Sequence, residues 1–334
     1  MAQLTKVHGS QNQFFLLDQT TLSTALTDDE LITLSRQITD PNTGILGGAD
    51  GLLVVNDSQH DETLGQMRVI NADGSEASMC GNGLRTVARY LAEKHDETHF
   101  AVETLTADLA VSAEGEFAPG VPAYSVEISP VRFNREALPF ENLGTETLID
   151  EAVPAFIPDL TFTSVAVPNP HLISFVSAAV LNSDALAKLG TELNGTNPYF
   201  PDGVNVNFAE ILGHNELFVR TFERGVGFTN ACGTGMSATS LAFAMTHPEA
   251  ADFETPMTIY NPGGKVQTKV HHTDSQYWID LVGNATETHH IEVAESALHQ
   301  ANVTAETTAI TATDEEAAYQ EFVAGLPRVS ELQL

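Results

Sequence analysis

A short frame that contains a cysteine occurs twice, and it constrains the fold more than any other feature of this sequence. Cys80 lies in "ASMCGNG" and Cys232 in "NACGTGM", so each cysteine is followed by Gly, one variable residue and Gly. The chain has only two cysteines, and both occupy this frame. We interpret the repeat as the mark of two similar halves that each supply one thiol.

The segments around the two frames also follow the same plan. A strand-like stretch and a turn, "ETLGQMRVINADGSEA", precede Cys80, and "ELFVRTFERGVGFT" precedes Cys232. After each frame, apolar residues recur at positions i, i+3, i+4 and i+7, which is typical of one face of a helix. They are Leu84, Val87, Ala88 and Leu91 in the first half, and Ala238, Leu241, Ala242 and Met245 in the second. Each cysteine is therefore predicted to stand at a loop-to-helix junction.

Short β-like segments such as "AYSVEI" and "TSVAV" surround these helices. We predict an α+β fold of two pseudo-symmetric halves, each a curved, mostly antiparallel sheet or barrel around a central helix. The predicted domains are residues 1–130, residues 131–285, and a closing segment at 286–334 that returns to the N-terminal half and ends in an acidic tail. From about residue 296 the chain has few large apolar residues. We expect a partly mobile appendage there, with one helix around "DEEAAYQEFVAGL".

The composition excludes several classes of partner. There are 45 acidic against 14 basic residues, a net charge of −31, which argues against nucleic acid and anionic membranes as partners. The N-terminus lacks the pattern of a secretory signal, and no apolar run approaches the roughly 18 to 20 residues of a membrane span. We therefore expect a soluble, cytoplasmic protein, in which thiols stay reduced.

The position of the cysteines suggests their chemistry. A helix N-terminus favours negative charge and lowers the pKa of a thiol. The backbone N–H groups of Gly81, Asn82, Gly233 and Thr234 would also be free to bind a carboxylate. Two facing thiols could act as a general base and a general acid, one removing a proton from a carbon and the other returning one to the opposite face. A racemase or epimerase needs such a pair.

Other uses of the cysteines are compatible with the sequence to different degrees. A single cysteine is often a small buried apolar residue, and a regulatory disulfide or a thiol redox or metabolite-binding protein stays open. There is no Cys-x-x-Cys or His-Glu-x-x-His motif, so no metal site is predicted. "GILGGADG" lacks the context of a dinucleotide motif, and none of the five lysines lies in a recognisable pyridoxal phosphate frame. No cofactor is predicted.

The two cysteine blocks, "NADGSEASMCGNGLRTVARY" and "ERGVGFTNACGTGMSA", closely resemble the signatures of the diaminopimelate epimerase family. Supporting blocks follow in the expected order: "VHGSQNQF", "GGADGLLVV", "VPNPHLISFV", "PDGVNVNF" and "NPGGKV". The resemblance covers residues 1 to about 295. It implies cofactor-independent conversion of LL- to meso-diaminopimelate, in lysine and peptidoglycan precursor synthesis. It further implies an active site in a cleft between the two halves, and a possible homodimer.

The resemblance also implies roles for individual residues. Cys80 and Cys232 would be the acid–base pair. The substrate would be held by Asn12, Asn71, Gly81, Asn82, Asn169, Asn205, Glu223, Arg224, Gly233 and Thr234. His171 and Glu223 would lie beside the reacting centre, contacting its ammonium group or tuning the thiols. From the residues alone, a structural histidine at position 171 and a surface salt bridge at Arg224 stay open.

Three positions depart from the family pattern. Phe228 stands where an acid is usual, Gln13 replaces an acid in the opening block, and "DPNTGIL" lacks a common Arg. These departures leave a racemase or epimerase of another amino acid, such as histidine or a proline-like substrate, as the alternative function.

Overall fold

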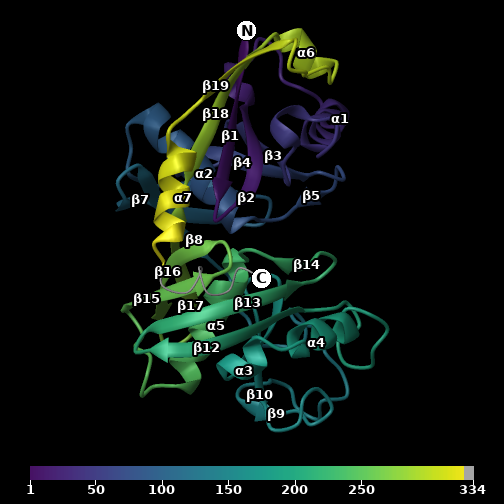
Figure 1. Ribbon diagram of the computed structural model, residues 1–334, viewed down its shortest axis with the longest axis vertical. Coiled ribbons are helices and arrows are strands. Elements are labelled where there is room, and N and C mark those ends of the chain that lie inside the picture. The colour runs from purple at the N-terminus through teal and green to yellow at the C-terminus, as the bar shows by residue number, and fades with distance from the viewer. Residues whose placement is uncertain (327–334) are drawn as a thin grey trace. The chain divides into compact units, whose positions relative to one another are not determined.

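The computed structural model describes residues 1–326. Its chain divides into two compact units (Figure 1). Unit 1 comprises residues 1–126 and 282–325; unit 2 comprises residues 127–281 and, among the described residues, Leu326. The last part of the predicted tail, residues 327–334, lies outside the described residues.

The sheet of unit 1 is mixed but mostly antiparallel. β1 pairs with β2 antiparallel, β2 with β3 parallel, and β3 with β4 antiparallel; the short β5 returns against β4. β4 then pairs with β6 parallel, and β6 with β7 and β7 with β8 antiparallel. The bounds are β1 Ala2–Gly9, β2 Asn12–Asp18, β3 Gly51–Asn56, β4 Thr63–Asn71, β5 Glu76–Ala77, β6 His99–Glu103, β7 Asp108–Ala118 and β8 Val121–Ile128.

Unit 2 repeats this order of pairings. β10 and β11 are antiparallel, β11 and β12 parallel, and β12 and β13 antiparallel, with the short β14 returning against β13. β13 then pairs with β15 parallel, and β15 with β16 antiparallel. The bounds are β9 Glu151–Ala152, β10 Thr161–Ala166, β11 Pro170–Phe175, β12 Asn205–Gly213, β13 Glu216–Glu223, β14 Gly227–Thr229, β15 Pro256–Asn261, β16 Gly264–His272 and β17 Tyr277–Asn284, whose last three residues belong to unit 1. The identical sequence of pairings confirms the predicted pseudo-symmetric α+β fold.

Each sheet holds one central helix. α2 (Gly81–His95) packs against β1 to β4 and β7, and α5 (Gly233–Thr246) packs against β10 to β13 and β16. Twelve residues of α5 are buried, as expected for a helix that is apolar all round. The hydroxyls of Ser237, Thr239, Ser240 and Thr246 donate to backbone carbonyl oxygens one turn back, so these groups are satisfied within the helix.

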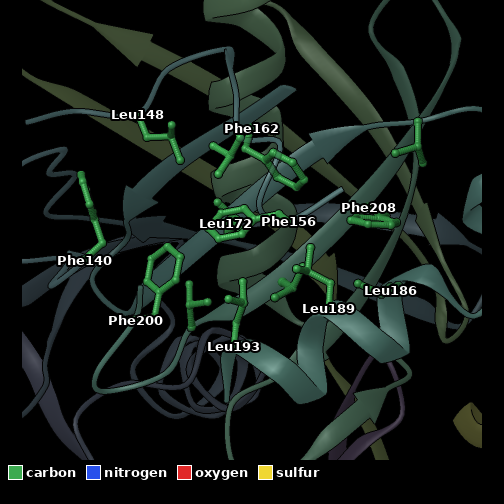
Figure 2. Close-up of a cluster of buried hydrophobic side chains, with 14 of the residues drawn as sticks. Phe140, Leu148, Phe156, Phe162, Leu172, Leu186, Leu189, Leu193, Phe200 and Phe208 are labelled. Carbon is green, nitrogen blue, oxygen red and sulfur yellow. The ribbon is translucent and has the colours of Figure 1, made fainter. Parts of the chain in front are cut away.

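Further helices cover each sheet. In unit 1, α1 (Asp28–Thr39) begins with a capping box at Thr27 and contacts β3 and β4. In unit 2, α3 (Ala178–Leu181) and α4 (Ala185–Leu193) contact β12. Figure 2 shows leucines of α4 facing a cluster of buried phenylalanines, which includes Phe200 and Phe208. Two short 3-10 helices, Gln19–Thr21 and Ile45–Gly47, complete unit 1.

The segment after residue 285 is an integral part of unit 1. β18 (Thr286–Val293) pairs with β1, α6 (Glu295–His299) contacts α1, and β19 (Thr308–Ala312) adds to β18. α7 (Glu315–Ala324) confirms the predicted terminal helix. Its Tyr319 is only 1% exposed and Glu315 pairs with Arg89 of α2, so the expectation of a loose appendage is wrong for this helix. The buried side chains of Tyr319 and Val323, the Arg89–Glu315 ion pair and the contact of Glu316 with His8 anchor this helix to unit 1.

None of the helices within residues 1–326 is long and apolar enough to cross a membrane.

Candidate active site

Cys80 is the N-cap residue of α2. Its backbone is extended, and its sulfur accepts a hydrogen bond from the Gly83 N–H at 3.4 Å. Cys232 is likewise the N-cap of α5. The prediction that both cysteines open a helix is therefore confirmed, and each sulfur lies where backbone N–H groups lack intrahelical acceptors.

The second glycine of each frame is required by close packing. A Cβ atom at Gly83 would lie 2.7 Å from the Leu53 side chain, and one at Gly235 would lie 2.5 Å from Oδ1 of Asn207. Both contacts are shorter than side chains tolerate. The repeated glycine thus lets the first turn of each helix approach its sheet.

In unit 1, asparagines gather around Cys80. The thiol donates to Oδ1 of Asn12 at 3.7 Å, and Nδ2 of Asn82 donates to the same oxygen at 3.2 Å. Asp50 lies on the other side of Asn12, accepting from its Nδ2 at 2.7 Å and from the backbone N–H of Gln13 at 2.8 Å. The structure thus brings two predicted residues, Asn12 and Asn82, into contact near the Cys80 thiol.

Asn71 ends β4 at the same edge of the sheet. It stands opposite Gly51, the residue after Asp50, and its Nδ2 donates to the Ser75 hydroxyl at 2.9 Å. Its side chain is thus held within its own turn. Gly81, the other predicted residue of this unit, is the first residue of α2 and is buried.

In unit 2, Cys232 contacts both a carboxylate and a hydroxyl. It shares a hydrogen bond with Glu223, and its sulfur lies 3.6 Å from Oγ1 of Thr234. Glu223 also accepts a hydrogen bond from Thr229. Burial raises the pKa of Cys232 well above its usual value, and the negative charge of Glu223 adds to this increase. The expected lowering of the thiol pKa is therefore wrong for Cys232, because desolvation and a like charge outweigh the helix N-terminus.

His171 lies at the centre of a buried network. Nδ2 of Asn207 donates to the carbonyl oxygens of Leu172 and Asn205, while its Oδ1 accepts from the Thr221 hydroxyl. The same Nδ2 lies 3.1 Å from Nδ1 of His171, so Nδ1 must be an unprotonated acceptor.

Nε2 of the ring therefore carries the proton. It lies 3.1 Å from Oδ1 of Asn169 and 3.0 Å from Oγ1 of Thr234. Burial lowers the pKa of His171 to about 3, and the positive charge of Arg224 acts in the same direction. His171 is thus a neutral donor that holds Thr234, and Thr234 in turn contacts Cys232.

Asn205 and Arg224 form the rim of this site. Oδ1 of the buried Asn205 accepts the backbone N–H of Arg224 at 2.8 Å. The Arg224 side chain is exposed and donates to the carbonyl oxygen of Asp202 at 3.0 Å. Within residues 1–326 it forms no ion pair with a carboxylate, so the surface salt bridge considered for it is not formed. Gly233 is the first, buried residue of α5.

The structure shows the surroundings of two of the departures from the family pattern, Phe228 and Gln13. Phe228 pairs across the hairpin with Phe222, at 5.5 Å between ring centroids, and Arg220 lies over its ring. The next residue, Thr229, is the one that reaches Glu223. At Gln13, where the family usually has an acid, the carboxylate of Asp50 accepts a hydrogen bond from the backbone N–H.

Sequence reasoning missed three residues of these networks: Asp50, Asn207 and Arg85. Asp50 and Asn207 lie in the quoted blocks "GGADGLLVV" and "PDGVNVNF", and Asn207 shares a strand face with Asn205 by the two-residue period. Arg85 is fully buried and donates to Oδ1 of Asn82 at 2.9 Å. Among residues 1–326 no cluster of three or more His, Cys, Asp or Glu side chains is arranged to hold a metal ion.

Comparisons with known proteins agree with the motif blocks. A family model described as diaminopimelate epimerase matches residues 4–128 and 163–287. The diaminopimelate epimerase of Enterococcus faecalis (strain ATCC 700802 / V583) is 52% identical, covering 96% of this chain and 97% of the relative. That of Lactiplantibacillus plantarum (strain ATCC BAA-793 / NCIMB 8826 / WCFS1) is 51% identical, covering 98% and 99%.

Solved structures with low sequence identity share the fold. A phenazine biosynthesis protein of the PhzF family from Bacillus anthracis has a TM-score of 0.62 at 14% identity, covering 88% of this chain and 99% of its own. A probable proline racemase from Agrobacterium radiobacter K84 has a TM-score of 0.56 at 14% identity, covering 92% and 98%. Together with the family match and the half-identical relatives, these findings confirm the resemblance: the chain belongs to the diaminopimelate epimerase family.

Proposed function

We propose that this protein interconverts LL- and meso-diaminopimelate without a cofactor, with Cys80 and Cys232 as the acid–base pair. The observation that carries the proposal is the duplicated site: each unit places one cysteine as the N-cap of its central helix. The identity of about half to curated diaminopimelate epimerases supports the substrate.

The reaction requires both thiols to reach opposite faces of one α-carbon. One sulfur, as thiolate, takes the α-hydrogen as a proton, and the electron pair stays on the carbon. The other sulfur, as thiol, gives its proton to the opposite face, so the configuration inverts and the two thiols exchange protonation states.

The α-carbanion must be stabilised electrostatically. The N–H groups at Gly81, Asn82, Gly233 and Thr234 stand in the first turns of α2 and α5, where they suit a carboxylate oxygen that gains negative charge. In unit 2, His171 donates to Thr234 and thereby holds its hydroxyl beside Cys232. Its neutral state argues for positioning rather than for proton transfer.

Arg224, Asn12, Asn71, Asn169 and Asn205 would hold the rest of the substrate. The exposed guanidinium of Arg224 has a fixed backbone and no carboxylate partner in the described chain, which suits a bidentate bond to a substrate carboxylate. An epimerase acting on a proline-like amino acid would not need such a distal contact.

The decisive experiment is incubation of the reduced protein with LL-diaminopimelate in deuterium oxide. NMR follows loss of the α-proton, and chiral chromatography follows the meso product, with histidine and proline in parallel. Deuterium entry with meso product supports the proposal. Exchange only with another amino acid would keep the chemistry and change the substrate, and no exchange with free thiols would favour a redox or binding protein.

We include in the proposal the cytoplasmic location expected from the sequence and the homodimer that the resemblance implies. Light scattering coupled to gel filtration would measure the mass, and a monomer at micromolar concentration would contradict this part.

A further inference from the structure

Unit 2 contains a groove that the proposed function does not use. The groove has a volume of about 730 Å³ and is lined by residues of the segment 127–134, by Thr147 and by residues 275–278. All of these residues belong to unit 2, and none of them has been placed in the candidate active site. The volume lies in the range of sites that bind small molecules, so the lining side chains indicate what the groove can hold.

The groove has one cation, and this cation has no partner. Arg132 lines the groove with an exposed side chain. Within residues 1–326 its guanidinium forms no ion pair and no hydrogen bond, whereas each of the other seven arginines there donates to a carboxylate or a carbonyl oxygen. In a chain with 45 acidic and 14 basic residues, such a cation is available to an anionic group of a ligand.

The backbone of Arg132 is held in place. Its N–H donates to the carbonyl oxygen of Ala166 at 3.0 Å, and its own carbonyl oxygen accepts from the Ala166 N–H at 2.8 Å. This antiparallel bridge ties Arg132 to the last residue of β10. The base of the side chain is therefore fixed before a ligand binds, which reduces the entropy that binding would cost.

The groove also has one carboxylate without a partner. Glu127 is half-buried, and in the described part of the chain its side chain forms neither a hydrogen bond nor an ion pair. Glu127 is the one acidic residue of the lining, as Arg132 is the one basic residue. Because the two charges do not pair with each other, both remain available to a ligand.

Three aromatic rings contribute to the wall of the groove. Phe133 and Tyr277 are half-buried and meet edge to face, with 5.9 Å between their ring centroids. Trp278 stacks on His271, with 5.0 Å between the ring centroids and an interplanar angle of 7°. Both ring nitrogens of His271 are in turn held by carboxylates, at 2.6 and 2.9 Å. These contacts provide an ordered apolar surface beside the two charges.

The two charges select the class of ligand. A simple anion would be attracted by Arg132 and repelled by Glu127, and a simple cation would meet the reverse. A zwitterion satisfies both, because a guanidinium binds a carboxylate through two hydrogen bonds and a carboxylate accepts hydrogen bonds from an ammonium group. The neighbouring rings suit an apolar side chain. An α-amino acid combines these three features in one small molecule.

We propose that this groove is a second amino-acid site of the protein. In it, Arg132 binds the α-carboxylate, Glu127 binds the α-ammonium group, and the rings of Phe133, Tyr277 and Trp278 contact an apolar side chain. The site uses no residue of the two cysteine networks. It therefore does not depend on the proposed function.

The test is a titration of the full-length protein with amino acids, followed by tryptophan fluorescence. Trp278 is the single tryptophan and lines the groove, so its emission reports binding there. The probes are L-leucine and L-phenylalanine, together with N-acetyl-L-leucine, which lacks the ammonium group, and L-leucinamide, which lacks the carboxylate. We expect a saturable change with both amino acids, and a Kd at least about tenfold higher for each modified leucine.

Variants assign the binding to the two charges. Arg132→Gln and Glu127→Gln should each raise the Kd for L-leucine at least about tenfold. Arg135→Gln is the matched control and should leave this Kd unchanged, because Arg135 does not line the groove and pairs with Glu146. The comparison of L-leucine with its two derivatives uses the wild-type protein alone, so it decides even if a variant fails to fold.

A further variant separates the groove from the candidate active site. Arg224→Gln removes the guanidinium that is proposed to bind the substrate of the epimerase, and it should leave the Kd for L-leucine unchanged. Loss of L-leucine binding in this variant would place the ligand at the active site and overturn the proposal.

Three other results would also overturn it. They are the absence of a saturable change with millimolar L-leucine and L-phenylalanine, an unchanged Kd in a folded Arg132→Gln protein, and equal binding of L-leucine and N-acetyl-L-leucine. The titration measures no turnover. Failure of diaminopimelate to exchange in deuterium oxide would therefore refute the proposed function and leave this second site standing.

Discussion

The acid sensitivity of unit 2 should come largely from His171. This ring is fully buried, its Nδ1 accepts from Asn207 and its Nε2–H donates to Thr234 and Asn169. Burial keeps the pKa of His171 at about 3 in the folded protein, while the unfolded chain has the ordinary value of about 6.5. Above pH 6.5 both states are neutral and the ring makes no pH-dependent contribution. As the pH falls from 6.5 towards 3, only the unfolded state takes up a proton, so the folded state loses stability.

The magnitude follows from this difference in pKa. Each pH unit between 6.5 and 3 costs about 1.4 kcal/mol, and lowering the pH from 7 to 4.5 crosses about two of these units, so it should cost about 3 kcal/mol through His171 alone. His171→Gln removes this contribution: the variant should be less stable than the wild type at pH 7, because partners in the network are lost. On acidification from pH 7 to pH 4.5, the free energy of unfolding of the variant should nevertheless fall by about 2 to 3 kcal/mol less than that of the wild type.

The assay is urea unfolding at pH 7 and at pH 4.5, followed by tryptophan fluorescence. Trp278 is the single tryptophan and belongs to unit 2, so its signal reports the unit that contains His171. His272→Gln, which removes an exposed histidine of the same unit, is the control and should keep the wild-type response. Equal acid responses in wild type and His171→Gln would refute the reasoning and show that His171 titrates as an ordinary histidine.

Three further outcomes are expected. Glu223→Gln should lower the pKa of Cys232, visible as a lower midpoint of its alkylation rate, and an unchanged midpoint would contradict the contact with Glu223. Gly235→Ala should destabilise unit 2 by about 1 to 3 kcal/mol in urea unfolding, because the new methyl group would lie 2.5 Å from Oδ1 of Asn207. Tyr319→Ala should destabilise unit 1 by about 3 to 5 kcal/mol in thermal unfolding, and an effect below about 1 kcal/mol would show that α7 is weakly attached.

Features that depend on neighbouring residues could be predicted from the sequence. The helices after Cys80 and Cys232 follow from apolar periodicity, and the repeated strand–turn–helix plan led to the pseudo-symmetric fold that the strand pairings confirm. The structure divides after residues 126 and 281, where the sequence suggested residues 130 and 285.

Features that depend on long-range packing could not be predicted. The burial of Arg85 requires glycines at positions 9 and 283, which no local pattern connects to it. The direction of the Cys232 pKa shift depends on burial and on Glu223, whereas the frame alone shows only a helix N-terminus. The neutral state of His171 depends on its burial, and the position of its proton depends on Asn207, which lies on a neighbouring strand.

The most direct test of the two-thiol mechanism is α-proton exchange in deuterium oxide by single-cysteine variants. With Cys80→Ala, the remaining thiol can remove and return a proton on one face only, so one of the two epimers should exchange without inversion. With Cys232→Ala, the other epimer should exchange, and neither variant should convert LL- to meso-diaminopimelate. Exchange of the same epimer by both variants, or epimerisation by either one, would contradict the assignment of one thiol to each face.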